Sequence, residues 1–225
     1  MKFYLAVVIL GNALLITLNH FFGSQLFNLE WFPLLFIILG VVGSTIGAIA
    51  IDATTAGLCH LIQNRLNLFS KYFYASKRQR NIMRRFGVGK FKNFLPDLGV
   101  LVKFPKGKIV DPKSKEYVHR YIMESCSGEL GHIVGLFAVI AIGLLTLFFI
   151  PQFFLPFILP IITINTILCF LPVLSLRYNR CALYTIYQIL DKRENRTAEQ
   201  PHSINGLGGI KGLEVLEEDF CENPI

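Results

Sequence analysis

The amino-acid sequence predicts an all-α integral membrane protein with about four transmembrane helices, arranged as two hairpins joined by a basic cytoplasmic loop. The 225 residues are 53% hydrophobic and only 16% charged, and their mean hydropathy is +0.51. Apolar runs as long and clean as those in this chain are typical of helices in lipid rather than of a soluble core. The uneven placement of Lys and Arg predicts how the helices are oriented.

Four apolar runs are candidate spans, and three to five spans are compatible with the sequence. The runs are Phe3–Leu18, Trp31–Ile51, Leu130–Ile150 and Phe153–Leu176. The first is short and spans only if the residues after it lie in the interface. It resembles a signal peptide poorly, because it has a single preceding Lys and no small-x-small cleavage site. Trp31 suits an interfacial anchor. Only two residues separate the last two runs, which predicts a tight helical hairpin.

Basic residues concentrate between the second and third spans. Residues 65–120 contain fifteen Lys or Arg and three acids, and six more bases follow from Arg177 to Lys211. The short connections 19–30 and 151–152 contain no Lys or Arg. The positive-inside rule therefore predicts a multi-pass protein of the cell membrane with both termini and the central loop cytoplasmic.

These boundaries divide the chain into four parts. We expect an N-terminal transmembrane hairpin (1–62), a basic and aromatic cytoplasmic or interfacial loop (63–120), a C-terminal transmembrane hairpin (121–190) and a polar, mobile cytoplasmic tail (191–225). Within the loop, residues 66–95 alternate aromatic and basic groups, a composition that suits contact with membrane lipids better than with nucleic acid. A simply solvated charged loop is the alternative.

The second span contains a possible packing face and several polar residues. Gly43 and Gly47 form a small-xxx-small pattern that favours close helix packing, within the chain rather than in a dimer. Asp52, Thr54, Thr55 and His60 follow in an extension of that helix. They either contribute to a polar site or mark a helix end that emerges into water.

Acidic and imidazole groups open the third span in the segment Glu-Ser-Cys-Ser-Gly-Glu-Leu-Gly-His. Glu124, Glu129 and His132 fall at about 0°, 140° and 80° around an α-helix, so they share one face. A carboxylate beside an imidazole orients it and raises its basicity, as a general base acting on a hydroxyl requires. The alternative is that these groups only anchor the helix at the interface.

The segment Arg-Tyr-Asn-Arg closes the fourth span, and its polar side chains belong to Arg177, Asn179 and Arg180. The tight hairpin predicts that this segment approaches the acidic and imidazole groups at one membrane face. Two guanidiniums and an amide offer donors for a phosphate, a carboxylate or an oxyanion. A positive-inside anchor is again the alternative, and the residues alone leave anchoring and function equally open.

Metal and disulfide chemistry find little support in the sequence. Glu129 and His132 form a Glu-x-x-His pair, but di-metal bundles need matching pairs on other helices, and neither a second pair nor His-Glu-x-x-His occurs. The five cysteines show no metal-binding spacing and no disulfide pattern. We therefore expect no metal site and reduced thiols.

Three segments, in order, resemble the glycosyl-4,4'-diaponeurosporenoate acyltransferase family over roughly residues 80–190. Residues 86–97 are similar to its aromatic-Lys-x-x-Leu-Pro stretch, with Phe91 where Trp is usual. The acidic and imidazole segment and the closing Arg-Tyr-Asn-Arg also match. Two departures are Cys181-Ala182-Leu183 after the closing segment, in place of Pro-x-Leu, and Gly131, where bulkier residues are common.

The resemblance implies transfer of a fatty acyl group to a hydroxyl of a glycosylated lipid or carotenoid at the cytoplasmic face. His132 would be the general base, held by Glu129, and Glu124 would bind sugar hydroxyls. Arg177, Asn179 and Arg180 would bind the acyl donor or stabilise the oxyanion. No bound cofactor is implied, and the donor, acyl-CoA or acyl carrier protein, is a co-substrate. The alternative is a non-enzymatic scaffold or lipid-binding protein of a lipid-biosynthesis complex, and the oligomeric state stays open.

Overall fold

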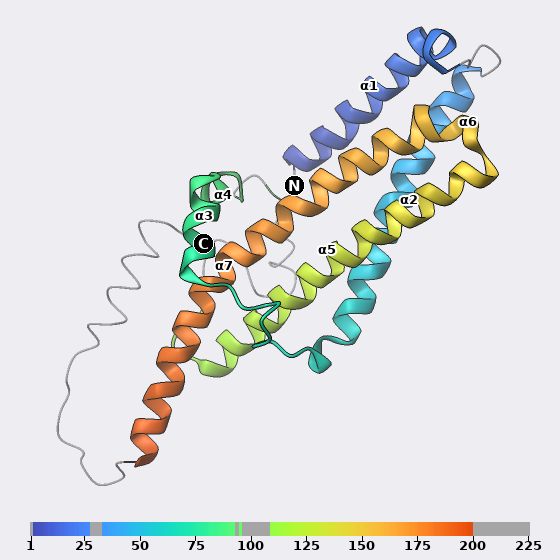
Figure 1. The fold of residues 1–225 in the computed structure, drawn as a ribbon. Helices are drawn as coiled ribbons and strands as arrows, with labels where there is room; N and C mark the ends of the chain where they lie inside the picture. The colour runs from blue at the N-terminus through green and yellow to red at the C-terminus, as the bar shows by residue number, and fades with distance from the viewer. Residues whose placement is uncertain (1, 28–32, 93–94, 96–108, 200–225) are drawn as a thin grey trace. The chain divides into compact units, whose positions relative to one another are not determined.

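The computed structural model describes residues 2–27, 33–92, 95 and 109–199, which form helices and no strand (Figure 1). Four of the helices in this part of the chain are long and apolar enough to cross a membrane. The predicted fold class, an all-α protein with about four spans, is therefore confirmed. Trp31, the loop segment 96–108 and the acidic tail 200–225 lie outside the described residues.

The chain divides into two compact units, which we describe separately. The first unit comprises residues 1–65, 94–96 and 127–174, and the second comprises 66–93, 97–126 and 175–225. Helices α5 (Lys115–Phe149) and α7 (Leu159–Glu199) each contribute to both units.

The first unit is a bundle of four helical segments. Helices α1 (Lys2–Phe27) and α2 (Leu34–Leu61) pack with the apolar parts of α5 and α7. Neighbouring helices touch at small or polar residues, which let apolar helices approach closely. The contacts that close the bundle are Asn12 to Thr45, Ala56 to Gly131, Gly143 to Ile162 and Ile164 to Gly11.

Helix α2 is longer than the predicted span and continues without a break to Leu61. Asp52, Thr54, Thr55 and His60 are therefore helical, as expected for an extension of the second span. Thr54 is exposed and donates only to the carbonyl of Ala50 on its own helix, whereas Asp52 is half-buried. The polar residues of this extension thus differ in their surroundings.

The structure places the close glycine contact of α2 at a different residue from the predicted one. A Cβ atom added to Gly43 or Gly47 would meet nothing within 4 Å, so internal packing does not need these glycines. One added to Gly40 would lie 3.3 Å from the ring of Phe157. The prediction of internal packing at Gly43 and Gly47 was wrong because that face of the helix points out of the bundle.

The connection between α5 and α7 is tight, as predicted. A single turn, α6 (Pro151–Phe153), and a π-helical segment, η4 (Phe154–Ile158), join the two long helices. Proline at position 156 cannot donate a backbone hydrogen bond, which disturbs the helical ladder at this point. Asn19 of α1 donates to the Pro156 carbonyl at 2.9 Å and so satisfies it from outside the helix.

The second unit contains short helices packed against the N-terminal part of α5 and the C-terminal part of α7. Helix α3 (Lys77–Arg85) begins with a capping box formed by Ser76 and Gln79, and α4 (Val88–Phe91) follows Gly87, whose φ is +76°. Only glycine adopts that angle at no steric cost. The described part of the predicted loop is therefore folded into short, defined pieces.

Aromatic and aliphatic side chains form the core of the second unit. Phe73 is buried there with Tyr184, whose hydroxyl donates to the carbonyl of Leu68. Phe86, in contrast, is 78% exposed. The rings of the basic and aromatic segment thus divide between a protein core and the surface.

Helix α5 begins at Lys115, inside the predicted loop 63–120. Helix α7 extends to Glu199, so the first nine residues of the predicted tail are helical. Lys115 forms ion pairs of 2.6 Å with both Asp191 and Glu194 and joins the two helices there.

Candidate functional site

The six predicted site residues lie on two continuous helices and fall in both units. Glu124, Glu129 and His132 lie on α5, and Arg177, Asn179 and Arg180 lie on α7. Glu129 and His132 belong to the first unit, and the other four belong to the second. The predicted approach of the two segments therefore stays a prediction, and each group is described within its own unit.

Arg180 is fully buried and bonds to the protein at three nitrogen atoms. Its Nη1 donates to the Phe73 carbonyl at 3.0 Å, and its Nη2 and Nε donate to the carbonyl and hydroxyl of Ser125 at 3.1 and 3.2 Å. The guanidinium also lies 5.6 Å from the centre of the Phe73 ring. These contacts hold the segment before α3 and helix α5 against α7. The residue is thus suited to positioning its neighbours rather than to binding a ligand directly.

Arg177 has a different environment, one turn earlier on α7. It is half-buried, and its guanidinium stacks 5.1 Å from the ring centre of Tyr72 while Nη2 approaches the Tyr72 carbonyl at 3.5 Å. Stacking leaves the edge of a guanidinium able to donate to a carboxylate or phosphate. Of the two arginines, Arg177 is better placed to meet an anion.

A basic cluster lies beside Arg177 in sequence. It consists of Tyr178 and Asn179 of α7 with Arg80 and Lys92. The Tyr178 ring lies 5.2 Å from the Arg80 guanidinium and 5.2 Å from the Lys92 amine, within the range of cation–π attraction. Lys92 is only 3% exposed, and its amine donates to Asn179 Oδ1 at 3.4 Å. Asn179 therefore orients Lys92 in this cluster.

The surroundings of Lys92 lower the proton affinity of its amine. Burial, and secondarily the neighbouring charge of Arg80, lower the pKa of Lys92 from 10.5 to about 8. An anion bound beside it would favour the charged form and reverse this effect. Lys92 is not one of the predicted site residues, although it is the Lys of the aromatic-Lys-x-x-Leu-Pro stretch, and that motif was the signal for it.

Glu129 and His132 occupy the inner side of α5. Glu129 is fully buried and His132 is half-buried. Around the helix, His132 falls about 60° from Gly135, which faces α2, and about 20° from Gly143, which faces α7. The imidazole therefore lies on the stripe of α5 that looks into the bundle. A buried carboxylate one turn from a half-buried imidazole is a suitable arrangement for proton transfer.

Glu124 is half-buried on the same helix, in the second unit. Among the residues that the structure describes, no three His, Cys, Asp or Glu side chains gather closely enough to hold a metal ion.

Comparison with known proteins gives one match. The family model for glycosyl-4,4'-diaponeurosporenoate acyltransferase matches residues 64–189, which is more than half of the chain. Searches of curated proteins and of solved structures found no match. The matched segment includes Lys92, Glu129, His132 and the closing Arg-Tyr-Asn-Arg. The chain therefore belongs to the glycosyl-4,4'-diaponeurosporenoate acyltransferase family, enzymes that transfer acyl groups in carotenoid biosynthesis.

Proposed function

We propose that this enzyme transfers a fatty acyl group from a thioester donor to a sugar hydroxyl of a glycosylated carotenoid, at the cytoplasmic face of the cell membrane. The observation that carries the proposal is the buried Glu129 one turn before the half-buried His132, on the inward stripe of an apolar helix. An ionisable pair in such a place is costly and is therefore a candidate for chemistry.

His132 serves as the general base in this proposal. It takes the proton of the acceptor hydroxyl while the oxygen attacks the thioester carbonyl, and a tetrahedral oxyanion forms. When the carbon–sulfur bond breaks, the thiolate leaves and takes the proton from the imidazolium. Glu129 stabilises the charged imidazole during this step. Glu124 contributes hydrogen bonds to other hydroxyls of the sugar.

The basic cluster of the second unit supplies the donor site. Arg177 and Lys92 provide positive charge, and Asn179 orients Lys92. Such a site suits the phosphate groups of acyl-CoA or of the acyl carrier protein's prosthetic arm. Arg180, which is buried and bonded to Phe73 and Ser125, positions this cluster rather than contacting the donor.

The test is an assay of the full-length protein in lipid nanodiscs with acyl-CoA and glycosyl-4,4'-diaponeurosporenoate, with the product identified by mass spectrometry. The wild type is expected to form the acylated glycolipid. His132→Gln should lower kcat by about 10²–10⁴-fold. The matched control is His20→Gln, which changes an exposed histidine of α1 and should leave turnover unchanged.

Two results would count against this assignment. Absence of acylated product from the wild type with either donor would reject the proposed reaction. Full turnover of His132→Gln would reject His132 as the base while leaving the reaction itself in place.

A further inference from the structure

Helix α3 (Lys77–Arg85) of the second unit combines a strong positive charge with apolar side chains that the protein leaves exposed. Its nine residues include one Lys, four Arg and no Asp or Glu. Ile82 is 45% exposed, and Phe86, which follows the helix as its C-cap, is 78% exposed. A single exposed apolar side chain is ordinary. Two of them on a helix this basic need a partner that suits both kinds of group.

The exposed apolar side chains and two of the arginines share one face of α3. At about 100° per residue, Phe86 lies about 40° from Ile82 around the helix, while Arg78 and Arg85 lie about 40° and 60° from Ile82 on its other side. Both arginines are exposed. The face formed by Ile82, Phe86, Arg78 and Arg85, the α3 surface, is therefore amphipathic, with an apolar half and a basic half.

The other side of α3 fastens the helix to the protein. Met83 is buried, and the Arg80 guanidinium lies 5.2 Å from the centre of the Tyr178 ring. Arg80 falls about 160° from Ile82 around the helix, so the α3 surface points away from Tyr178. Within the part of the second unit that the structure describes, the apolar half of the α3 surface therefore stays exposed.

The contact with Tyr178 also sets the level of α3 along α7. Tyr178 comes two residues after the apolar run Phe153–Leu176, a rise of about 3 Å. At the same level, the 48% exposed ring of Tyr72 stacks on Arg177. Aromatic and basic side chains just beyond an apolar span are typical of the membrane–water interface. Helix α3 is therefore held at the level expected for lipid headgroups.

An anionic lipid surface fits both halves of the α3 surface. An amphipathic helix lying in the membrane plane buries its apolar side chains at the boundary between headgroups and acyl chains, while its cations meet lipid phosphates. Guanidinium groups suit such phosphates because they can donate two parallel hydrogen bonds. A nucleic acid would pair with the arginines but would leave Ile82 and Phe86 in water.

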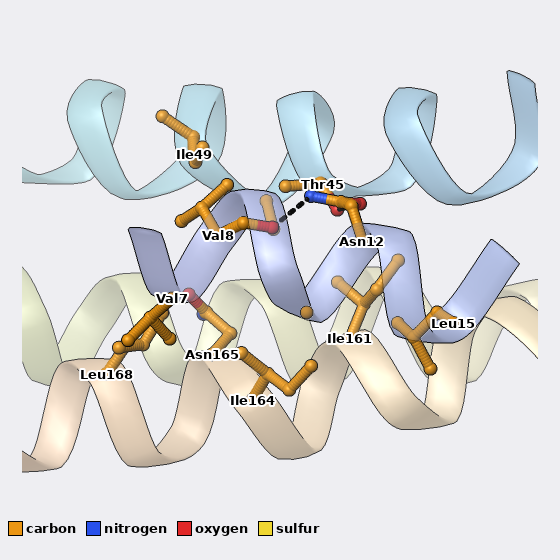
Figure 2. A pocket seen from close by; sticks show the side chains of 12 residues that line it. Val7, Val8, Asn12, Leu15, Thr45, Ile49, Ile161, Ile164, Asn165 and Leu168 are labelled. Atoms are coloured by element: carbon orange, nitrogen blue, oxygen red, sulfur yellow. Dashed lines mark hydrogen bonds between the residues drawn. The ribbon is translucent and has the colours of Figure 1, made fainter. Parts of the chain in front are cut away.

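The interior of the first unit offers much less room for lipid. A cleft between α1, α2 and α7 has a volume of about 40 Å³, which holds only a few water-sized groups (Figure 2). Asn12 and Thr45 lie side by side in its wall, and the Thr45 hydroxyl donates to Asn12 Oδ1 at 2.8 Å. The cleft therefore serves contact between helices, and the outer surface is the better candidate for lipid binding.

We propose that α3 docks in the interface of an anionic lipid leaflet, with Ile82 and Phe86 at the acyl boundary and Arg78 and Arg85 on lipid phosphates. The inference concerns how the protein is seated in the membrane and does not depend on the proposed acyl transfer. Because Arg80 on the same helix contacts Tyr178, docking of α3 would also hold the basic cluster in position.

The experiment measures the depth of α3 by tryptophan fluorescence, with full-length protein in nanodiscs of phosphatidylcholine and phosphatidylglycerol. Trp31 is the only tryptophan of the sequence, so Trp31→Phe gives a silent background for Phe86→Trp. Lipids brominated at different acyl positions should place the new indole about 5–10 Å into the boundary. The matched control is Asn81→Trp, which is also exposed but lies about 140° from Phe86 around the helix. Its indole should be quenched by aqueous acrylamide and not by brominated lipid.

The role of charge is tested by adding Arg78→Gln and Arg85→Gln to the Phe86→Trp protein. Each basic residue near an anionic leaflet favours the docked state about fivefold, so removing both arginines should lower the docking equilibrium about 25-fold. Nanodiscs of phosphatidylcholine alone should weaken docking in the same direction. The matched control, Lys192→Gln with Arg196→Gln, removes two exposed charges near the end of α7 and should leave the depth unchanged.

Each result decides the inference, and none of them bears on the proposed reaction. Quenching of the Phe86→Trp protein by acrylamide alone, in both kinds of nanodisc, would show that α3 faces water and overturn the proposal. Equal depth in both lipids and in the arginine variant would overturn the assignment to anionic lipid. Shielding from acrylamide that needs two copies in one nanodisc would also overturn it, because a second copy of the chain would then cover this surface.

Discussion

The two units of this enzyme place polar groups among apolar ones in different ways. In the second unit, Arg180 is fully buried and donates hydrogen bonds to Phe73 and Ser125. In the first unit, Asp52 is half-buried and accepts a hydrogen bond from the Cys169 thiol, a weak donor. Buried polar atoms are normally satisfied. Exceptions occur in both units, at Asn19 Oδ1 of the first and Ser175 Oγ of the second, so the units differ in the strength of their buried polar contacts and not in having such exceptions.

The same contrast extends to packing. Helices of the first unit meet at glycines, such as Gly131, where an added Cβ atom would lie 3.0 Å from Ala56 Cα. Segments of the second unit meet through aromatic rings stacked with cations, such as Tyr178 with Arg80. Glycine contacts allow close approach in a lipid environment, where no hydrophobic force draws helices together. Mutations at matched positions test this difference between the two units.

The largest effect is expected from Arg180→Met. It removes the donors to the Phe73 carbonyl and to the Ser125 carbonyl and hydroxyl, and hydrogen bonds from a charged donor contribute about 1.5–3 kcal/mol each. Arg177→Met should cost much less, because Arg177 is half-buried and stacks on Tyr72. Thermal unfolding of both variants in the same detergent gives the comparison. Equal losses of stability would mean that the two arginines do not differ in role.

The second prediction is that the stability of the protein depends on pH through the ionisation of Lys92. Because its pKa is about 8 in the folded protein and 10.5 when unperturbed, the unfolded chain binds more protons between these values. Stability linked to Lys92 should therefore rise as the pH increases from about 8 to about 10.5, by up to about 3 kcal/mol.

The measurement is the difference in thermal midpoint between wild type and Lys92→Met at pH 7 and pH 10. Relative to the variant, the wild type should gain stability at the higher pH. A constant difference would show that Lys92 keeps its proton over this range, as it would beside a carboxylate.

A smaller loss is expected from Gly131→Ala. The added methyl group would press on the Ala56 backbone, which cannot rotate away, and overpacking of this kind costs about 1–3 kcal/mol. Gly43→Ala is the control, since nothing lies within 4 Å of the new atom. Thermal unfolding should separate the two, and equal stability would remove the argument that Gly131 sets the approach of α2.

The helices themselves followed from the sequence. Apolar length predicted all four spans, and the two residues between the last runs predicted the tight turn. The ends of the helices were harder to predict from the sequence. Helix α7 continues to Glu199 because its polar turns are supported by partners such as Lys115 on α5. Hydropathy cannot show such contacts, since they depend on a distant part of the chain.

The candidate site could be predicted only as a set of residue types. Helical spacing placed Glu129 and His132 on one helix, but it could not distinguish the fully buried Arg180 from the half-buried Arg177. The sequence also left Asp52 open between a polar site and an exposed helix end. Its contacts with Cys169 of α7 and with the backbone at Gly135 of α5 became visible only when α5 and α7 were packed against α2. Burial of polar atoms is a tertiary property, and periodicity does not encode it.

The smallest effect tests whether the basic helix α3 of the second unit depends on its own local signals. Ser76 Oγ accepts from the Gln79 amide at 3.3 Å, and Gln79 Oε1 accepts from the Ser76 amide at 2.9 Å. Ser76→Ala should cost about 1 kcal/mol and speed amide hydrogen exchange in the first turn of α3.

Gln79→Glu is the conservative control for this cap, because glutamate can accept the same hydrogen bond and its charge suits a helix N-terminus. It should preserve the exchange protection that Ser76→Ala removes. Arg80, one residue further along α3, stacks on Tyr178 and transmits the position of the helix to the basic cluster. If Ser76→Ala leaves exchange around Arg80 unchanged, the tertiary contact with Tyr178, rather than the cap, holds this helix in place.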